Sequence, residues 1–363
     1  MRVAMINPQG YGNLQVYDNG LIRNLGDDID VFYYCNIKAK KLEGLKCKHY
    51  FTYKTRSVFA IPTYILNMLR VWIDIYRQEV DIVHIQWAKL FFFDDLCMFF
   101  FRMVVHRKCR LVYTAHNLWP HKMSSKLRCV YKYRYWLPDV IIVHDQETAN
   151  KIIKLFPRLN VKVVPAGATW MGSEGDLDPH VAAFCDHNAK KLLTVIGAPG
   201  LYKNTELLIS AWLRSRLQDR GYYLVLAGAG YENTLKGDYQ SRGIFWSQRS
   251  VSDRTLRYIC ERSFGFLLPY SRISQSGVLL TVTEFRKPIL CSKVGALGDF
   301  VKTFKVRVLA DIGSTETLAG SLNKFVSFYT DNNFVEDWGD VDDKMSWDAA
   351  SKATRALYCE VSG

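Results

Sequence analysis

A polar turn in the second half of the chain has the composition of an anion-binding site. The sequence SQSG at 274–277 follows the apolar run 265–268 and opens an apolar helical stretch at 278–285. A helix N-terminus offers free backbone N–H groups and the positive end of the helix dipole, which favour diphosphates and hydroxyl-rich ligands. We therefore predict a site for a ligand the size of a nucleotide sugar, with contacts from Ser274, Gln275, Ser276 and Gly277.

Lys203 lies in a second loop of this kind. The sequence IGAPGLYKN at 196–204 follows the apolar run 192–196 and precedes the helical stretch 205–214. An ammonium group in such a loop would neutralise the negative charge that develops on a departing diphosphate. The alternative is that Lys203 is simply an exposed lysine at the start of a helix.

Imidazole and amide side chains that follow a strand in the first half are candidates for sugar contacts. His116 and Asn117 come after the strand predicted at 111–114, and His121 follows shortly afterwards. A neutral imidazole and an amide can each donate a hydrogen bond to a sugar hydroxyl or a diphosphate. We place His116 near the reacting centre, and Asn117 and His121 on the acceptor side. The alternatives are that His116 satisfies a backbone carbonyl and that His121 lies on the surface.

With Glu147 as the other possible carboxylate, Asp145 is a candidate general base. It follows the strand predicted at 140–144, and a transfer that inverts the configuration of a sugar needs a carboxylate to deprotonate the acceptor hydroxyl. The alternative role for Asp145 is to cap the helix that follows. At the end of the first strand, Gly10 and Gly12 in the loop NPQGYGN would let the backbone approach a diphosphate closely.

Two sets of alternating strands and helices must position these residues. Apolar strands separated by helical stretches predict parallel pairing and an α/β fold with two doubly wound domains. The strands are predicted at 2–6, 31–35, 82–86, 111–114, 140–144 and 161–164, and then at 192–196, 222–227, 244–246, 265–268, 289–292 and 306–309. We predict a first domain at 1–170, a linker at 171–189, a second domain at 190–340, and a segment at 341–363 whose helix packs back onto the first domain.

The segment 269–301 resembles the C-terminal signature of GT-B glycosyltransferases of the group-1, family 4-like superfamily. In that signature a P-Y turn precedes a helix ending in x-G-K-P, and the turn here is similar to that of a subgroup that reads S-Q-S-G. The loop at 196–204 resembles the family's F-G-R-x-x-x-x-K-G, with Lys203 at the lysine. The sequence TAHNLWPHK at 114–122 resembles an H-N-x-x-P-H sequence seen in some members.

The chain departs from the family pattern at three places. Most members carry a Glu-x7-Glu pair that contacts the transferred sugar and the nucleotide ribose, whereas this chain has Ser274 or Gln275 and Thr281 or Val282 in those regions. Glu284 is our substitute for the ribose contact. Arg286 stands where the family has glycine, and the arginine of the diphosphate loop is missing.

The resemblance implies two Rossmann-like domains that face a central cleft, with the N-terminal domain for the acceptor. The donor would be held in the C-terminal domain by Gly197, Lys203, the 274–277 turn and Glu284, and the loop with Gly10 and Gly12 in the N-terminal domain would approach its diphosphate. The implied activity is transfer of a hexose from a nucleotide diphosphate sugar to a lipid-linked or surface-polysaccharide precursor. Two alternatives remain: a non-catalytic sugar-binding partner subunit, and a nucleotide-sugar epimerase or hydrolase.

No cofactor and no metal are expected beyond the nucleotide-sugar co-substrate. Asp-x-Asp triplets occur at 28–30, 176–178 and 340–342, but none follows a predicted core strand as a metal-binding pair would. Nine cysteines without a C-x-x-C pair fit reduced thiols in the cytoplasm.

The charge distribution indicates an anionic partner. The chain carries a net charge of +13, and the segment 102–134 holds nine Lys or Arg residues and no acidic residue. Aromatic side chains are interleaved with them: Tyr113, Trp119, Tyr131 and Tyr133, with Trp136 beyond. This basic, aromatic segment suits an anionic membrane surface or a lipid-linked diphosphate. The alternative is a solvated basic helix without a partner. No nucleic-acid-binding motif accompanies it, so we expect no nucleic-acid partner and a peripheral place on the cytoplasmic side of the plasma membrane.

Overall fold

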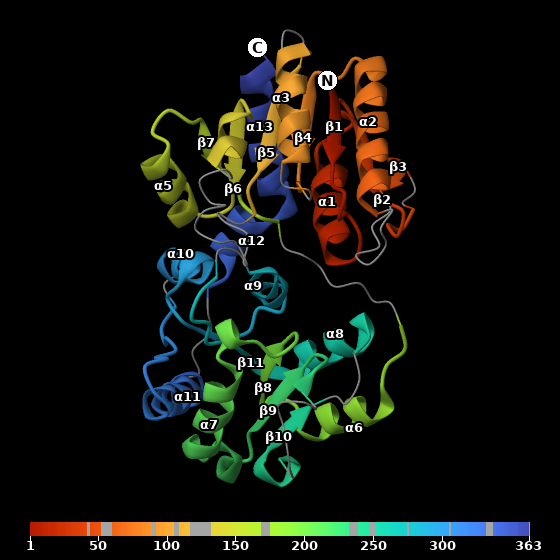
Figure 1. The fold of residues 1–363 in the computed structure, drawn as a ribbon. Coiled ribbons are helices and arrows are strands. Elements are labelled where there is room, and N and C mark those ends of the chain that lie inside the picture. Colours follow the sequence, from red (N-terminus) through yellow and green to blue (C-terminus); the bar gives the residue numbers. More distant parts are fainter. Residues whose placement is uncertain are drawn as a thin grey trace. The chain divides into compact units, whose positions relative to one another are not determined.

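The computed structural model divides the chain into two compact units. Unit 1 comprises Met1–Thr169 with Lys344–Gly363, and unit 2 comprises Trp170–Asp343 (Figure 1). The structure describes residues 1–41, 44–51, 60–88, 90, 92–104, 109–116, 132–167, 175–231, 239–246, 251–273, 276–304, 306–331 and 337–362.

Unit 1 is built on a parallel sheet of seven strands in the order β3-β2-β1-β4-β5-β6-β7. The strands are β1 (Arg2–Ile6), β2 (Asp30–Asn36), β3 (Lys46–Phe51), β4 (Ile82–Ile85), β5 (Arg110–Thr114), β6 (Val140–Val143) and β7 (Val161–Val163). Parallel strands covered on both faces read as continuous apolar runs. In β1, Ala4 and Ile6 enter the core on one face, and Val3 and Met5 enter the core on the other.

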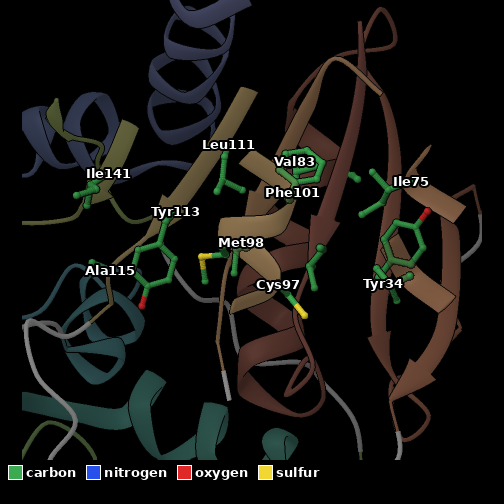
Figure 2. Close-up of a cluster of buried hydrophobic side chains, with 14 of the residues drawn as sticks. Tyr34, Ile75, Val83, Cys97, Met98, Phe101, Leu111, Tyr113, Ala115 and Ile141 are labelled. Atoms are coloured by element: carbon green, nitrogen blue, oxygen red, sulfur yellow. The ribbon is translucent and has the colours of Figure 1, made fainter. Parts of the chain in front are cut away.

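Helices cover both faces of this sheet. The helices are α1 (Asn13–Asn24), α2 (Ala60–Gln78), α3 (Phe93–Val104), α5 (Gln146–Leu155) and α13 (Trp347–Ser362). Side chains of α2, α3 and α5 share one core, and those of α1 and α13 share the other. Figure 2 shows part of the first core, where Ile75 of α2 and Met98 and Phe101 of α3 pack with strand residues.

Unit 2 has a parallel sheet of five strands in the order β10-β9-β8-β11-β12. The strands are β8 (Leu192–Ile196), β9 (Tyr223–Ala227), β10 (Ile244–Trp246), β11 (Ser263–Leu268) and β12 (Ile289–Cys291). The α-helices are α6 (Pro179–His187), α7 (Thr205–Ser215), α8 (Asp253–Arg262), α9 (Gly277–Thr283), α10 (Gly295–Phe304), α11 (Thr315–Asp331) and α12 (Gly339–Met345), which crosses the division between the units. Helices α7 and α11 share one core of the sheet, and α6 and α8 share the other.

Three elements differ from the sequence-based expectation. The predicted linker contains α6, which begins after the capping carboxylate of Asp178 and packs in the core of unit 2 with α8. The strand β3 was not expected, because its edge position leaves most of its side chains only half-buried and blurs the apolar alternation. The strand predicted at 306–309 is wrong: only Leu309 pairs, in an isolated bridge with Cys291.

The basic, aromatic segment needs a correction within its described part. Tyr113 is 5% exposed and lies in the core of unit 1, and Arg134 is buried in an ion pair with Asp95 at 2.6 Å. Tyr133 and Trp136 are exposed. Among the described residues, no helix is both long and apolar enough to cross a membrane.

Candidate functional site

The strand order of unit 2 predicts a ligand site beside the carboxyl ends of β8 and β11. In a doubly wound sheet, ligands bind where the strand order reverses, and here that point lies between these two strands. The loops that follow them are joined. The Asn204 side chain donates to Pro269 O at 2.7 Å, and Ser271 N donates to Tyr202 O at 2.8 Å. The Lys203 loop and the P-Y turn therefore form one structure.

Lys203 is not an exposed lysine. Its side chain is 8% exposed, and Nζ donates to Ile196 O at 3.2 Å and to Ala198 O at 3.0 Å. Burial lowers the pKa of this ammonium. Since an ammonium has three N–H groups, two hold the loop and one remains for a ligand. Lys203 thus both shapes the loop and places a positive charge in it.

Glycines allow this loop to pack closely against β9. Gly197 has φ +89°, and a Cβ there would meet Lys203 Nζ at 2.8 Å. A Cβ at Gly228 would stand 2.5 Å from the backbone of Gly197, and the Tyr231 hydroxyl donates to Gly197 O at 2.9 Å. Gly228 and Tyr231 were missed from the sequence, although the run AGAG after β9 was a signal for a close backbone approach.

Ser276 and Gly277 lie at the start of α9. The Ser276 side chain is buried and accepts from Leu279 N at 3.1 Å, so it caps the helix. Ser274 and Gln275 lie outside the described residues. Glu284 stands at the other end of α9, where burial raises its pKa. Its role as the ribose contact stays a prediction.

The structure adds a local feature to each of two residues that belong to the segment 269–301. Arg286 has φ +53°, a left-handed backbone conformation that glycine adopts more readily than arginine does. Tyr270 is 1% exposed, and within the described part of the chain its hydroxyl has no hydrogen-bond partner. Its ring lies edge-on to Tyr202, with 5.7 Å between the centroids. A buried unpaired hydroxyl costs free energy, so Tyr270 Oη is a candidate ligand contact.

Unit 1 gathers polar side chains at the carboxyl ends of its central strands. His116 Nε2 lies 3.2 Å from Gln86 Oε1, so this ring nitrogen faces a side-chain amide. The His116 ring lies 5.2 Å from that of His144 and 5.3 Å from that of Tyr17, and it stacks on Trp87 at 5.6 Å. This cluster joins residues that follow β4, β5 and β6 with one from α1.

The protonation state of His144 follows from its partners. Its Nδ1 lies 2.9 Å from Val164 O, and because a carbonyl only accepts, Nδ1 carries the proton. Nε2 is then the acceptor that faces the Tyr17 hydroxyl at 3.4 Å. Burial lowers the pKa of His144 to about 4, so the ring is neutral at physiological pH.

His84 is fully buried beneath this cluster. Its Nδ1 lies 2.5 Å from the Tyr358 hydroxyl and its Nε2 lies 2.7 Å from Thr114 Oγ1, which ties β4 to β5 and α13. Burial lowers the pKa of His84 to about 3. We assign it a structural role, because both ring nitrogens are engaged within the protein.

The loop after β1 rests on a buried carboxylate. Asp18 Oδ2 accepts from Asn7 Nδ2 at 2.6 Å and from the Tyr33 hydroxyl at 2.5 Å, and burial raises the Asp18 pKa to about 7. A Cβ at Gly10 would stand 2.2 Å from that hydroxyl oxygen, so the loop needs glycine there. Gly12 has φ +57°, and a Cβ there would meet nothing within 4 Å, so its backbone conformation rather than space favours glycine.

The remaining predicted residues have simpler placements. Asp145 is buried and accepts from Thr148 N at 2.7 Å, which is the capping role proposed as its alternative. Asn117 and His121 lie outside the described residues. Where side chains are described, no three His, Cys, Asp or Glu residues gather as a metal site would require. Asp28 pairs with Arg355, Asp30 pairs with Lys46, and Asp178 caps α6.

Comparisons with known proteins agree with this architecture. Residues 19–168 match the family model described as Glycosyltransferase Family 4. No curated protein sequence matches the chain. The fold is similar to that of a sucrose-phosphate synthase from Thermosynechococcus elongatus, with TM-score 0.71, 13% identity and 99% of each chain covered.

Two further solved structures share the fold. WaaG, a glycosyltransferase involved in lipopolysaccharide biosynthesis, has TM-score 0.64 at 10% identity over 99% of each chain. The Anabaena protein HepE, in complex with UDP and glucose, has TM-score 0.63 at 14% identity over 99% of this chain and 95% of that chain. The chain therefore has the GT-B fold, and its residues 19–168 match the model of Glycosyltransferase Family 4.

Proposed function

We propose that this protein transfers a hexose from a nucleotide diphosphate sugar to a hydroxyl of a lipid-linked or surface-polysaccharide precursor. The observation that carries the proposal is the nearly buried Lys203 ammonium, held in a glycine-bounded loop beside the P-Y turn. A preorganised positive charge stabilises the charge that develops on a leaving diphosphate. The UDP and glucose bound to the similar HepE structure support a nucleotide-sugar donor.

The donor would lie at the carboxyl end of the unit 2 sheet. Lys203 would contact the diphosphate with its remaining N–H. Gly197 and Gly228 keep the loop narrow, and the unpaired Tyr270 hydroxyl is a further donor to the ligand. Ser276, Gly277 and Glu284 stay predicted contacts, as do Ser274 and Gln275 outside the described residues.

The acceptor would be activated in unit 1. In the transfer, the acceptor oxygen bonds to the anomeric carbon, its proton passes to a base, and the nucleotide diphosphate leaves with the electrons of the broken bond. We place the His116 imidazole at the acceptor hydroxyl, with Gln86 and Trp87 fixing its orientation. Asp145 is a weaker candidate, because its carboxylate caps α5.

The proposed reaction takes place at the cytoplasmic surface of the plasma membrane, without a metal or cofactor. The involvement of WaaG in lipopolysaccharide biosynthesis supports a lipid-linked or surface-glycan acceptor. The positive net charge and the aromatic residues Tyr133 and Trp136 on the surface of unit 1 support contact with anionic lipid.

The test is a thermal-shift titration with UDP, GDP, dTDP and ADP sugars, with and without EDTA. A ligand that binds the folded state raises its apparent stability by mass action. We expect one nucleotide class to shift the melting temperature with or without EDTA, and Lys203→Ala to lose that shift. Lys324→Ala, which removes an exposed lysine on α11, is the matched control.

Turnover separates the transferase from the other activities. Sugar transfer that requires an acceptor supports the proposal. Product formed from the donor alone indicates an epimerase or hydrolase, and donor binding with no product under any condition indicates a non-catalytic partner subunit. A donor-induced shift that Lys203→Ala retains in full would overturn the site assignment.

A further inference from the structure

Helix α2 carries an apolar stripe on its solvent side. The exposed fractions are 56% for Ile61, 50% for Leu66, 48% for Leu69, 53% for Ile73 and 70% for Tyr76. The last four are spaced by three, four and three residues, which places them on one side of a helix. The other side of the helix is buried in the core of unit 1, through Tyr64, Met68, Val71 and Ile75. Helix α2 is thus apolar on two sides, one of them facing solvent.

Helix α3 repeats this arrangement. Its core side consists of Cys97, Met98 and Phe101. The exposed side, together with Phe92 just before the helix, consists of Phe92 at 68%, Leu96 at 50%, Phe99 at 47%, Phe100 at 56% and Met103 at 71%. Single exposed apolar residues are ordinary, but nine on two helices and one just before the second helix form a patch of the kind that marks an interaction surface.

The two stripes belong to one surface. Trp72 of α2 and Phe101 of α3 are in ring contact, with centroids 4.7 Å apart, and the Tyr64 hydroxyl donates to Asp94 Oδ1 at 2.9 Å. Both helices cover the same face of the unit 1 sheet (Figure 1). We name the ten exposed side chains of the two stripes the α2/α3 face.

Charge around the α2/α3 face is positive. Arg70 and Arg77 are exposed on α2, and Arg102 near the end of α3 donates to Trp136 O at 3.0 Å, which places the backbone of Trp136 near the end of that helix. The acidic residues of the two helices are engaged within the protein. Asp74 pairs with Lys48, Asp95 pairs with Arg134, and Asp94 accepts from Tyr64.

We propose that the α2/α3 face docks on an anionic lipid bilayer, with both helices lying in the membrane interface. Apolar stripes beside basic residues, with tryptophan and tyrosine at the edge, bind such a surface through apolar burial and attraction to acidic headgroups. A second copy of the chain would bring the same arginines to the interface, and the like charges would repel each other. This favours lipid as the binding partner of the α2/α3 face. The docking is argued from the exposed side chains alone. Only its purpose, to bring the protein to a lipid-linked acceptor, rests on the proposed function.

Vesicle co-sedimentation tests the docking without donor or acceptor. We expect the protein to pellet with vesicles of phosphatidylcholine and phosphatidylglycerol, more weakly with phosphatidylcholine alone, and less at high salt. The double variant Phe100→Ser with Met103→Ser should bind the anionic vesicles at least about tenfold more weakly. Arg70→Gln with Arg77→Gln should lose about fivefold per arginine, and only with the anionic vesicles.

The matched control replaces two exposed apolar residues elsewhere in unit 1. Ile153 and Leu155 on α5 are 40% and 44% exposed and lie outside both stripes, so Ile153→Ser with Leu155→Ser should bind vesicles as the wild type does. Melting temperatures of all variants show whether each remains folded. A change in the control equal to that of the α3 variant would overturn the assignment to this face.

Two other outcomes would also overturn the inference. The wild type could fail to pellet with anionic vesicles, or it could form a concentration-dependent dimer in sedimentation velocity that the Phe100→Ser, Met103→Ser variant abolishes, which would assign the face to a second copy. The nucleotide-sugar titration is made without vesicles. A melting-temperature shift with a nucleotide sugar but no vesicle binding would therefore contradict only the docking. Vesicle binding without such a shift would contradict only the transferase proposal.

Discussion

The indole of Trp347 packs directly on the backbone of Gly20. A Cβ built at Gly20 would stand 2.2 Å from Trp347 Cε2, and one built at Gly167 would stand 2.2 Å from Trp347 Cε3. Trp347 begins α13, so the C-terminal helix is seated on α1 through a position where only glycine fits. The same indole lies 5.3 Å from the ring of Tyr17, which links this packing to the His116 cluster.

We expect Gly20→Ala to destabilise unit 1 by about 1–3 kcal/mol, because the methyl group must displace the indole. In a helix without such a neighbour, the same change stabilises by up to about 1 kcal/mol, since alanine has the higher helix propensity. Hydrogen exchange of the α1 and α13 amides measures the effect locally.

The matched control is Gly320→Ala in α11, where a Cβ would meet nothing within 4 Å. It should leave unit 2 unchanged or more stable. Equal effects of the two substitutions would mean that helix propensity alone sets the result, and the packing explanation would fail.

Acidic pH should weaken unit 1 through its two buried histidines. Their pKa values in the folded protein are about 3 for His84 and about 4 for His144, whereas an unfolded histidine titrates near 6.5. Between about pH 4 and 6.5 the unfolded chain therefore binds more protons, so the free energy of unfolding falls as pH falls. The slope approaches about 1.4 kcal/mol per pH unit for each histidine. The free energy of unfolding of His144→Gln, measured by chemical denaturation, should fall less steeply as the pH is lowered. Equal slopes for variant and wild type would contradict this prediction.

Asp18 should act with the opposite sign. Its folded pKa is raised to about 7, above the value of 3.8 for an ordinary aspartate, so between these values the folded protein binds more protons and stability is lost as pH rises. Asp18→Asn removes this titration and keeps an oxygen that can accept from Asn7 and Tyr33. As the pH rises from 5 to 8, the free energy of unfolding of the variant should increase by about 2 kcal/mol relative to that of the wild type. Chemical denaturation at pH 5 and at pH 8 measures the free energy of unfolding of both proteins. The same difference between variant and wild type at both pH values would show that Asp18 titrates normally.

Much of the fold was readable from the sequence because buried parallel strands are continuous apolar runs. The strands at 2–6, 192–196 and 244–246 were predicted with the bounds that the structure has. The fold class is confirmed by the two parallel sheets and by the similar structures. The edge strand β3 and the helix α6 were missed, because partly exposed side chains and a loop-like composition hide the pattern.

The candidate site was less accessible, because its geometry depends on contacts between distant parts of the chain. The strand-to-loop positions of Lys203 and His116 could be predicted from neighbouring sequence. The unpaired state of Tyr270, the buried Asp18, and the contact of Gly228 with Gly197 arise only when separate strands are brought together. For Asp145 the sequence allowed two roles, because a carboxylate at the start of a helix can act as a base or cap the helix. The hydrogen bond from Thr148 N shows the capping role.

Tyr270→Phe distinguishes a ligand contact from a purely structural tyrosine. Within the described residues the hydroxyl is buried and unpaired, so its removal should leave the free protein as stable or more stable, by up to about 1 kcal/mol. If the hydroxyl donates to the nucleotide sugar, the same variant should bind the donor about tenfold more weakly, since a hydrogen bond to a charged group contributes about 1.5–3 kcal/mol. Calorimetric titration gives the affinity, and the melting temperature without ligand gives the stability. Tyr222→Phe, which alters another tyrosine of unit 2 whose hydroxyl lies 3.3 Å from Thr330 Oγ1, is the control. Weaker donor binding in both variants, or a marked loss of stability in Tyr270→Phe alone, would show that the Tyr270 hydroxyl serves the fold and not the ligand.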